Sequence, residues 1–228
     1  AHYATSQEIA AADVILIQET SAWPGEATTR TAQIAEQMAM TWAHDPVRLL
    51  PDGVMQGNAI ISRLPLERIA VKLLPNVEQP YHGQPRRAIA ADVVIGDKRL
   101  RVVSVHLDVR LQITDRIRQL DPAVTDMDER VVVGGDFNTA PWQWADGLVP
   151  LTSTEAVVGM EQAAILDDYM ASRRYASALS VDTNTFRLPL GMRLDNLYPR
   201  AVPMLGAGVE HVGGSDHWPI YVDVDLCN

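Results

Sequence analysis

The chain is 228 residues long, enough for one domain of ordinary size or two small ones. Its hydrophobic content of 47% fits a globular protein with a sizeable core, and no run of about 18 apolar residues predicts a transmembrane segment. The formal charge is −10, from 19 Lys and Arg against 29 Asp and Glu. This balance argues against tight, non-specific binding to duplex nucleic acid, which needs a basic face. It does not exclude a phosphate substrate, because a bound divalent metal inverts the local field.

Cysteine content and sequence complexity bound the organisation of the chain. Cys227 is the only cysteine, so we expect no internal disulfide. No secretory leader is visible in residues 1–228, which leaves both the cytoplasm and export open. No repeat, low-complexity tract or linker divides the chain, so residues 1–228 are predicted to form a single domain.

Apolar runs alternate with amphipathic ones along the chain. Strands are predicted, in chain order, over residues 14–17, 58–62, 88–95, 100–107, 131–133, 194–198 and 219–226. Gly96-Asp97 is typical of a hairpin turn between two of them. Helices are predicted over residues 28–42, where Ile34, Met38 and Trp42 recur every four residues, over 110–120, and over part of 155–170. Several successive strands with few long helices predict an α/β protein with two packed sheets and helices outside.

The segment 131–138, Val-Val-Val-Gly-Gly-Asp-Phe-Asn, carries the strongest chemical signal. Its β-branched residues predict a buried strand. If extended geometry continues past the glycines, Asp136 and Asn138 point to the same side, and an acid and an amide at a strand exit suit a hydrolytic metal site. The alternative is an ordinary turn, since Gly, Asp and Asn all favour turns.

Four further polar groups lie at the ends of predicted apolar strands. They are Gln18-Glu19, His106, the segment 193–196 with Asp195, and the segment 215–217 with Asp216 and His217. Polar side chains in such places cost free energy of desolvation unless they are paired or solvated in a cleft. A carboxylate such as Glu19 suits Mg2+, a hard cation that prefers oxygen ligands. Each group also has a structural alternative: a helix cap, a satisfied buried histidine, an arginine partner and a turn, respectively.

In their order and spacing, these motifs resemble the endonuclease/exonuclease/phosphatase superfamily. That family includes pancreatic-type deoxyribonuclease, abasic-site endonucleases, neutral sphingomyelinases and inositol polyphosphate phosphatases. The resemblance extends from about Ala12 to the C-terminus and rests on Gln18-Glu19, residues 57–62 (GNAIIS), His106-Leu107, residues 135–138 (GDFN), residues 193–195 (RLD) and residues 215–217 (SDH). It implies a deoxyribonuclease I-like fold: a four-layer α/β/β/α sandwich of two packed mixed sheets flanked by helices. It also implies divalent-metal-dependent hydrolysis of a phosphoester.

The resemblance implies roles for the acidic residues. Glu19 looks like the principal metal ligand, with Asp216 near the same ion, which is expected to be Mg2+, with Mn2+ or Ca2+ as alternatives. Asp136 looks like the group that orients or deprotonates the attacking water, and Asn138 would hold that water or a phosphate oxygen. A metal supplies the charge stabilisation that phosphoryl chemistry needs.

The two histidines also take roles from the resemblance. His217 would lie against the scissile phosphate, oriented by Asp195, and His106 would donate to a non-bridging phosphate oxygen. A carboxylate behind a histidine raises the pKa of the ring and fixes its tautomer, which favours a cation beside phosphate.

The sequence departs from the family pattern in two places. Members usually begin with a strand that carries a Trp-Asn or similar pair, and Glu19 lies too close to residue 1 to leave room for it. We therefore expect that strand to be absent from residues 1–228, which would expose a sheet edge. Second, some nucleases of the family have a glutamate near Arg87, where this chain has Arg86-Arg87. Arg87 is then either a phosphate contact or a surface arginine at a strand start.

The substrate is the least specified feature. Asn58, Arg87 and Trp142 are the predicted substrate contacts. Trp142 and Trp144 either form a wall that stacks a base or touches a lipid, or they pack under their own loop. The leading hypothesis is a nuclease-type phosphodiesterase whose partner is nucleic acid. The alternative is a lipid phosphodiesterase or phosphatase, of sphingomyelinase or phosphoinositide type, acting on a phospholipid headgroup. A second alternative is an inactive binding module, or a fragment completed by another chain.

Overall fold

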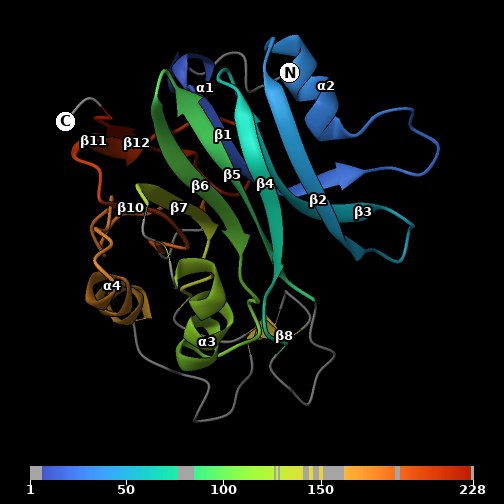
Figure 1. Ribbon diagram of the computed structural model, residues 1–228. Helices are drawn as coiled ribbons and strands as arrows, with labels where there is room; N and C mark the ends of the chain where they lie inside the picture. Colours follow the sequence, from blue (N-terminus) through green and yellow to red (C-terminus); the bar gives the residue numbers. More distant parts are fainter. Residues whose placement is uncertain are drawn as a thin grey trace.

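The computed structural model describes residues 7–76, 85–125, 127, 129–140, 144–145, 149–150, 162–187 and 191–226. Two larger sheets dominate these residues (Figure 1). The first is antiparallel and consists, in spatial order, of β1 (Val14–Ala22), β3 (Met55–Ser62) and β2 (Thr41–Leu49). The second is mixed, because β6 and β7 run parallel, and consists in spatial order of β10 (Asp195–Arg200), β7 (Val131–Asp136), β6 (Lys98–His106), β5 (Arg87–Ile95) and β4 (Leu66–Leu73).

Shorter elements complete the described fold. Two-stranded sheets pair β11 (Met204–Val209) with β12 (Ile220–Val224), and β8 (Trp144–Ala145) with β9 (Val149–Pro150). The helices are α1 (Gln7–Ala11), α2 (Arg30–Gln37), α3 (Ile113–Val124) and α4 (Gln162–Ser172). In the described residues, none of these helices has the length and apolarity needed to cross a membrane.

Three apolar clusters define the layers. On the outer face of the first sheet, Ala35 of α2 packs with Ile61 of β3. Between the two sheets, Ile60 of β3 packs with Ile89 and Val102 of the second sheet. Neighbouring residues 60 and 61 thus point to opposite faces of one strand, as the alternation of side chains requires. The first sheet is therefore covered by a helix on one face and by the second sheet on the other.

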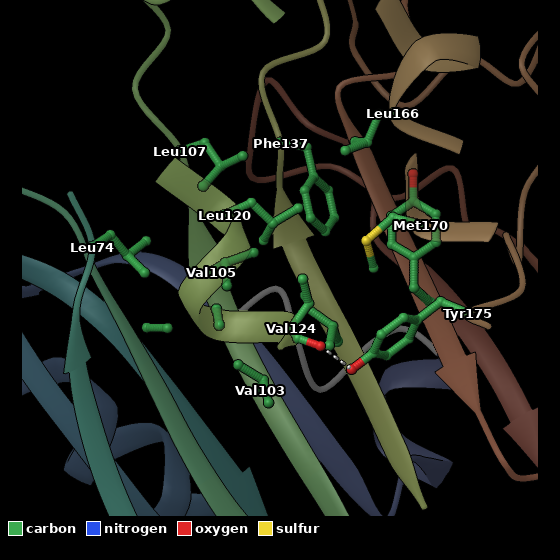
Figure 2. Close-up of a cluster of buried hydrophobic side chains, with 14 of the residues drawn as sticks. Leu74, Val103, Val105, Leu107, Leu120, Val124, Phe137, Leu166, Met170 and Tyr175 are labelled. Atoms are coloured by element: carbon green, nitrogen blue, oxygen red, sulfur yellow. Dashed lines mark hydrogen bonds between the residues drawn. The ribbon is translucent and has the colours of Figure 1, made fainter. Parts of the chain in front are cut away.

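The third cluster lies between the second sheet and the helices α3 and α4. Figure 2 shows Val103 and Val105 of β6 facing Leu120 of α3, with Met170 of α4 on the far side of the cluster. The Tyr175 hydroxyl donates a hydrogen bond of 3.3 Å to the backbone oxygen of Val124. The order of layers is thus helix, sheet, sheet, helices, which confirms the predicted α/β/β/α sandwich.

The structure corrects one helix prediction. The helix predicted over residues 28–42 spans only Arg30–Gln37, because Ala39 adopts a left-handed φ of 53° and β2 begins at Thr41. Trp42, which continued the predicted apolar stripe, lies 43% exposed in that strand. The hairpin turn at Gly96-Asp97 is confirmed between β5 and β6, and Gly96 has a φ of 62°. The strands β2, β4, β8, β9 and β11 escaped prediction.

One edge of the first sheet lies beside a large cleft. In the described residues, β1 pairs only with β3, and β12 pairs only with β11. A cleft of about 1350 Å³ is lined by both β1 and β12, including the half-buried side chains of Leu16 and Val222, and continues to the ends of β6 and β7. The predicted absence of a first strand, and the single-domain organisation of residues 1–228, stay predictions.

Candidate active site

Strand register brings three distant polar residues into one row. His106 ends β6, Asp136 ends β7 and Asp195 begins β10. Because β7 lies between the other two strands, His106 and Asp195 are both register partners of Asp136. All three side chains line the cleft. Residues 106, 136 and 195 therefore meet because of the sheet order, although long stretches of sequence separate them.

Gly135 allows β7 to pass close to the backbone of β6. A Cβ atom on Gly135 would lie 1.9 Å from the backbone oxygen of Val105, and Gly135 has a φ of 145°. The extended geometry ends at Asp136, since Asn138 adopts a left-handed φ of 53° and its backbone N–H donates to Oδ1 of Asp136 at 2.8 Å. The segment 131–138 is thus a buried strand up to Asp136, as the first interpretation predicted, and it then ends in a local turn, as the second predicted.

Asp195 holds the ring of His217 in a fixed orientation. The Oδ2 atom of Asp195 lies 2.8 Å from Nδ1 of His217, and the buried hydroxyl of Thr185 donates to the same oxygen at 2.8 Å. The Thr185 oxygen also accepts the backbone N–H groups of Leu194 and Asp195, at 3.0 and 3.1 Å. With Nδ1 directed at Asp195, the Nε2 atom of His217 faces Asp136, whose Oδ2 is 4.0 Å away.

The two histidines have opposite electrostatic environments. Burial by itself would lower the pKa of His217, but the hydrogen bond and charge of Asp195, with the charges of Asp136 and Asp216, raise it to about 10. Burial lowers the pKa of His106 well below its usual value, and the cations Arg86 and His217 lower it further. Near neutral pH the site therefore combines a cationic His217 with a neutral His106.

Asp136 lies between these rings and close to other acids. Its Oδ2 atom is 3.5 Å from Nε2 of His106. Burial raises the pKa of Asp136 to about 7, and the charge of Asp195 acts in the same direction while His217 opposes it. A carboxyl group with such a pKa can accept and release a proton near neutral pH. The arrangement suits proton transfer beside a bound anion.

A family model decides which class of protein this site belongs to. The model of the Endonuclease/Exonuclease/phosphatase family matches residues 4–217. The chain belongs to this family. Members hydrolyse phosphoester bonds and generally depend on divalent metal ions, so this family member is a phosphoric ester hydrolase. A search of curated protein sequences finds no match.

Solved structures of this family share the fold at low sequence identity. An endonuclease/exonuclease/phosphatase family protein from Leptotrichia buccalis C-1013-b has a TM-score of 0.67 and 14% identity, over 94% of this chain and 87% of that one. A mannosyl-6-phosphatase from Bacteroides thetaiotaomicron VPI-5482 has a TM-score of 0.59 and 12% identity, over 94% and 85%. The endonuclease domain of TRAS1, a telomere-specific non-LTR retrotransposon, has a TM-score of 0.56 and 16% identity, over 95% and 87%.

The predicted metal ligands of this phosphoesterase lie at the rim of the same cleft. Glu19 is exposed, has a left-handed φ of 55° and lies where the register between β1 and β3 shifts. Asp216 is also exposed, and the Ser215 hydroxyl donates to its Oδ1 at 3.3 Å. In the described residues, the side chains with potential ligand atoms within 4.8 Å of one another are Asp136, Asp195 and His217. The structure therefore brings Glu19 and Asp216 to the cleft but not into this group.

The donor chemistry of the cleft fits a hard divalent cation. Carboxylates of Glu19, Asp136, Asp195 and Asp216 all line it, and oxygen ligands are those that Mg2+ prefers. The raised pKa of Asp136 reflects burial and the neighbouring negative charge of Asp195. A bound cation would relieve that repulsion and favour the ionised carboxylate.

Three predicted side chains are engaged within the protein. The Nδ2 group of Asn58 donates to the backbone oxygen of Arg87 at 2.8 Å, and Nη1 of Arg87 lies 3.0 Å from Oδ1 of Asp45. The Nδ2 group of Asn138 donates to the backbone oxygen of Leu107 at 2.8 Å. These bonds leave the amide oxygens of Asn58 and Asn138 for other contacts. Trp142, the remaining predicted substrate contact, lies outside the described residues.

Three residues escaped sequence reasoning: two line the cleft, and the third, Thr185, is buried behind Asp195. Thr185 lies in an Asn-Thr-Phe segment that has no recognisable catalytic pattern, yet it bonds Asp195 directly. Arg86, the neighbour of the predicted Arg87, lines the cleft with His106, as does Arg48 of β2. Only the doublet Arg86-Arg87 offered a signal, and it did not show which arginine faces the cleft.

Proposed function

We propose that the protein hydrolyses a phosphodiester of nucleic acid, by in-line attack of an activated water, with Mg2+ as its ion and Mn2+ or Ca2+ as alternatives. One observation carries this proposal: Asp136 lies between a neutral and a cationic histidine, and Asp195 orients the cationic one. The similarity in fold to the TRAS1 endonuclease domain supports the choice of nucleic acid.

Glu19 would hold the metal ion, and Asp216 would lie beside it at the mouth of the cleft. When bound, the ion would supply positive charge to the phosphate oxygens and lower the pKa of the attacking water. Both carboxylates are exposed, so an ion can reach them without a change in the core.

Asp136 would accept the proton of the attacking water. Its position between His106 and His217 places the carboxylate where it can accept a proton beside a bound phosphate, and a bound cation would keep it ionised. Asn138 would position that water or a phosphate oxygen with its amide oxygen or through water, because its Nδ2 group already donates to Leu107.

The histidines would contact the phosphate itself. His217, held by Asp195, would place a cation against the scissile group. His106, neutral because of burial, would donate a hydrogen bond to a non-bridging oxygen. Fixed donors of this kind stabilise charge that develops in the transition state, which is the main requirement of phosphoryl transfer.

The proposed substrate contacts beyond the scissile group are Asn58, Arg87 and Trp142. Arg87 is 40% exposed and paired with Asp45, so it would touch a phosphate at the edge of the cleft and exchange part of that ion pair. Asn58 is buried and would act through its amide oxygen. The stacking role of Trp142 stays a prediction.

A lipid phosphodiesterase or a phosphatase is the second candidate function. The similarity in fold to a protein named mannosyl-6-phosphatase favours considering phosphomonoesters as well. Plasmid DNA, RNA, sphingomyelin and phosphoinositides should be offered in parallel at equal enzyme concentration. Cleavage of a lipid with DNA untouched would refute the nucleic-acid proposal.

Catalysis is tested by turnover of bis-para-nitrophenyl phosphate with Mg2+ or Mn2+. Asp136→Asn should lower kcat about 100-fold or more, because it removes the proton acceptor while keeping the side-chain shape. Asp97→Asn makes the same charge change in an exposed turn and should leave the rate unchanged. Equal rates for the wild type and Asp136→Asn would refute the assigned base. No turnover of any substrate would favour a binding module or a fragment that another chain completes.

A further inference from the structure

Arg86 is a nearly buried cation whose side chain has no partner within the described residues. It lies directly before β5, is 8% exposed and lines the cleft with His106 and Asp136. Its Nε atom is buried without a hydrogen-bond acceptor in the described part of the chain. Other buried arginines are satisfied: Arg116 donates to Gln162 and to two backbone oxygens, and Arg193 pairs with Asp167.

Arg48 of β2 adds a second unpaired cation to the same side of the cleft. It is half-buried and lines the cleft beside Glu19 and His106. No hydrogen bond or ion pair joins its side chain to another residue in the parts of the chain that the structure describes. Arg48 and Arg86 are close enough to repel each other. Two like charges held together without a counter-ion are costly, so an anion would be favoured there.

Nearby acids compensate for only part of this positive charge. The charges of Asp108, Asp136 and Glu19 act on Arg86, but no acid of the described residues lies within ion-pair distance of it. Glu19 is also the proposed ligand of the metal ion. Arg87, next in sequence, differs because Asp45 neutralises it at 3.0 Å. The positive charge without an ion-pair partner therefore belongs to Arg86 and not to its neighbour.

We propose that Arg48 and Arg86 bind a second phosphate group of the substrate, beside the scissile one, so that the preferred substrate is a phosphodiester with an adjacent phosphomonoester. This rests on the proposed hydrolytic function. A phosphomonoester carries about −1.5 to −2 charges near pH 7, which two guanidinium groups match. The scissile diester would face His217 and Asp136. His106 lies 3.5 Å from Asp136 and lines the same part of the cleft as the two arginines, so the second phosphate would lie close to the first.

The first test measures anion binding without catalysis. Metal-free protein is titrated with inorganic phosphate while the Arg Nε–Hε signals are followed by NMR. The Arg86 signal should shift saturably. Arg86→Gln should weaken phosphate binding at least 10-fold, and Arg48→Gln should do the same if the first variant fails to fold. Arg118→Gln, which removes the same charge at an exposed position away from the cleft, should bind as the wild type. No saturable shift, or equal weakening by Arg118→Gln, would overturn the proposal.

The second test compares two chromogenic substrates in the presence of Mg2+. Thymidine 5′-(para-nitrophenyl phosphate) and its 3′-phosphorylated form differ only in the second phosphate. The wild type should show about a 10-fold lower KM for the 3′-phosphorylated form, with similar kcat, and Arg86→Gln should abolish that preference. Equal KM values with turnover of both would overturn the second-phosphate site and leave the hydrolytic function standing. Phosphate binding at Arg86 without turnover of either substrate would refute the proposed phosphodiesterase function and support the anion site.

Discussion

Replacement of Asp195 by asparagine isolates the electrostatic contribution of the Asp195–His217 pair to stability. The amide keeps the shape of the side chain but loses its charge, and Nδ1 of His217, only 2.8 Å from Oδ2, loses an ionic acceptor. Burial opposes protonation of His217, whereas Asp195, Asp136 and Asp216 together raise its pKa to about 10. A hydrogen bond between charged groups contributes about 1.5 to 3 kcal/mol, so the lost interaction in this mostly buried pair is about 3 kcal/mol.

The pH dependence of this loss follows from the direction of the shift. Because the folded pKa of His217 lies above the unfolded value, the stabilisation is fully present below about pH 6.5 and disappears as pH rises through about 10. Asp195→Asn should therefore lower the free energy of unfolding by about 3 kcal/mol at pH 6 and by much less at pH 9.5. The pair is about three-quarters shielded from solvent on the histidine side, so screening reduces this value only modestly.

Urea unfolding of metal-free protein in EDTA at pH 6 and pH 9.5 measures the effect. The control is Asp97→Asn, an exposed change of the same charge in the β5–β6 turn, which should shift stability by less than about 0.5 kcal/mol at either pH. An equal loss for Asp195→Asn at both pH values would refute the electrostatic reasoning and indicate that Asp195 acts only through its hydrogen bonds.

Three further predictions concern the same site. Thr185→Val keeps the side-chain volume but leaves two buried backbone N–H groups without their acceptor, so it should cost about 2 kcal/mol in urea unfolding, whereas Thr185→Ser should stay near the wild type. Gly135→Ala places a Cβ 1.9 Å from a backbone oxygen and should cost about 3 kcal/mol or more, against about 1 kcal/mol for Gly96→Ala, which meets no atom within 4 Å; similar losses would contradict the close-packing argument. The carboxyl group of Asp136 should titrate near pH 7 by 13C NMR in EDTA and at lower pH with Mg2+, because a nearby cation favours the carboxylate; an unchanged titration would place the ion elsewhere.

Much of the site could be predicted because its residues stand at the ends of apolar strands. The run Val131–Val133 identified a buried strand, and Asp136 follows it at the cleft. Patterns failed where local sequence was ambiguous. The four-residue spacing of Ile34, Met38 and Trp42 predicted a longer helix, but the left-handed Ala39 and strand pairing at Thr41 end it.

The sequence by itself determined which residue types stand at strand ends, because burial and alternation are local properties of a strand. Only the tertiary structure decided which of them meet. The row of His106, Asp136 and Asp195 depends on sheet order and register. The choice between Arg86 and Arg87 depends on which neighbours surround each side chain. Thr185 reaches Asp195 from a separate loop. Such contacts join separate strands and loops, so they follow from packing and not from local pattern.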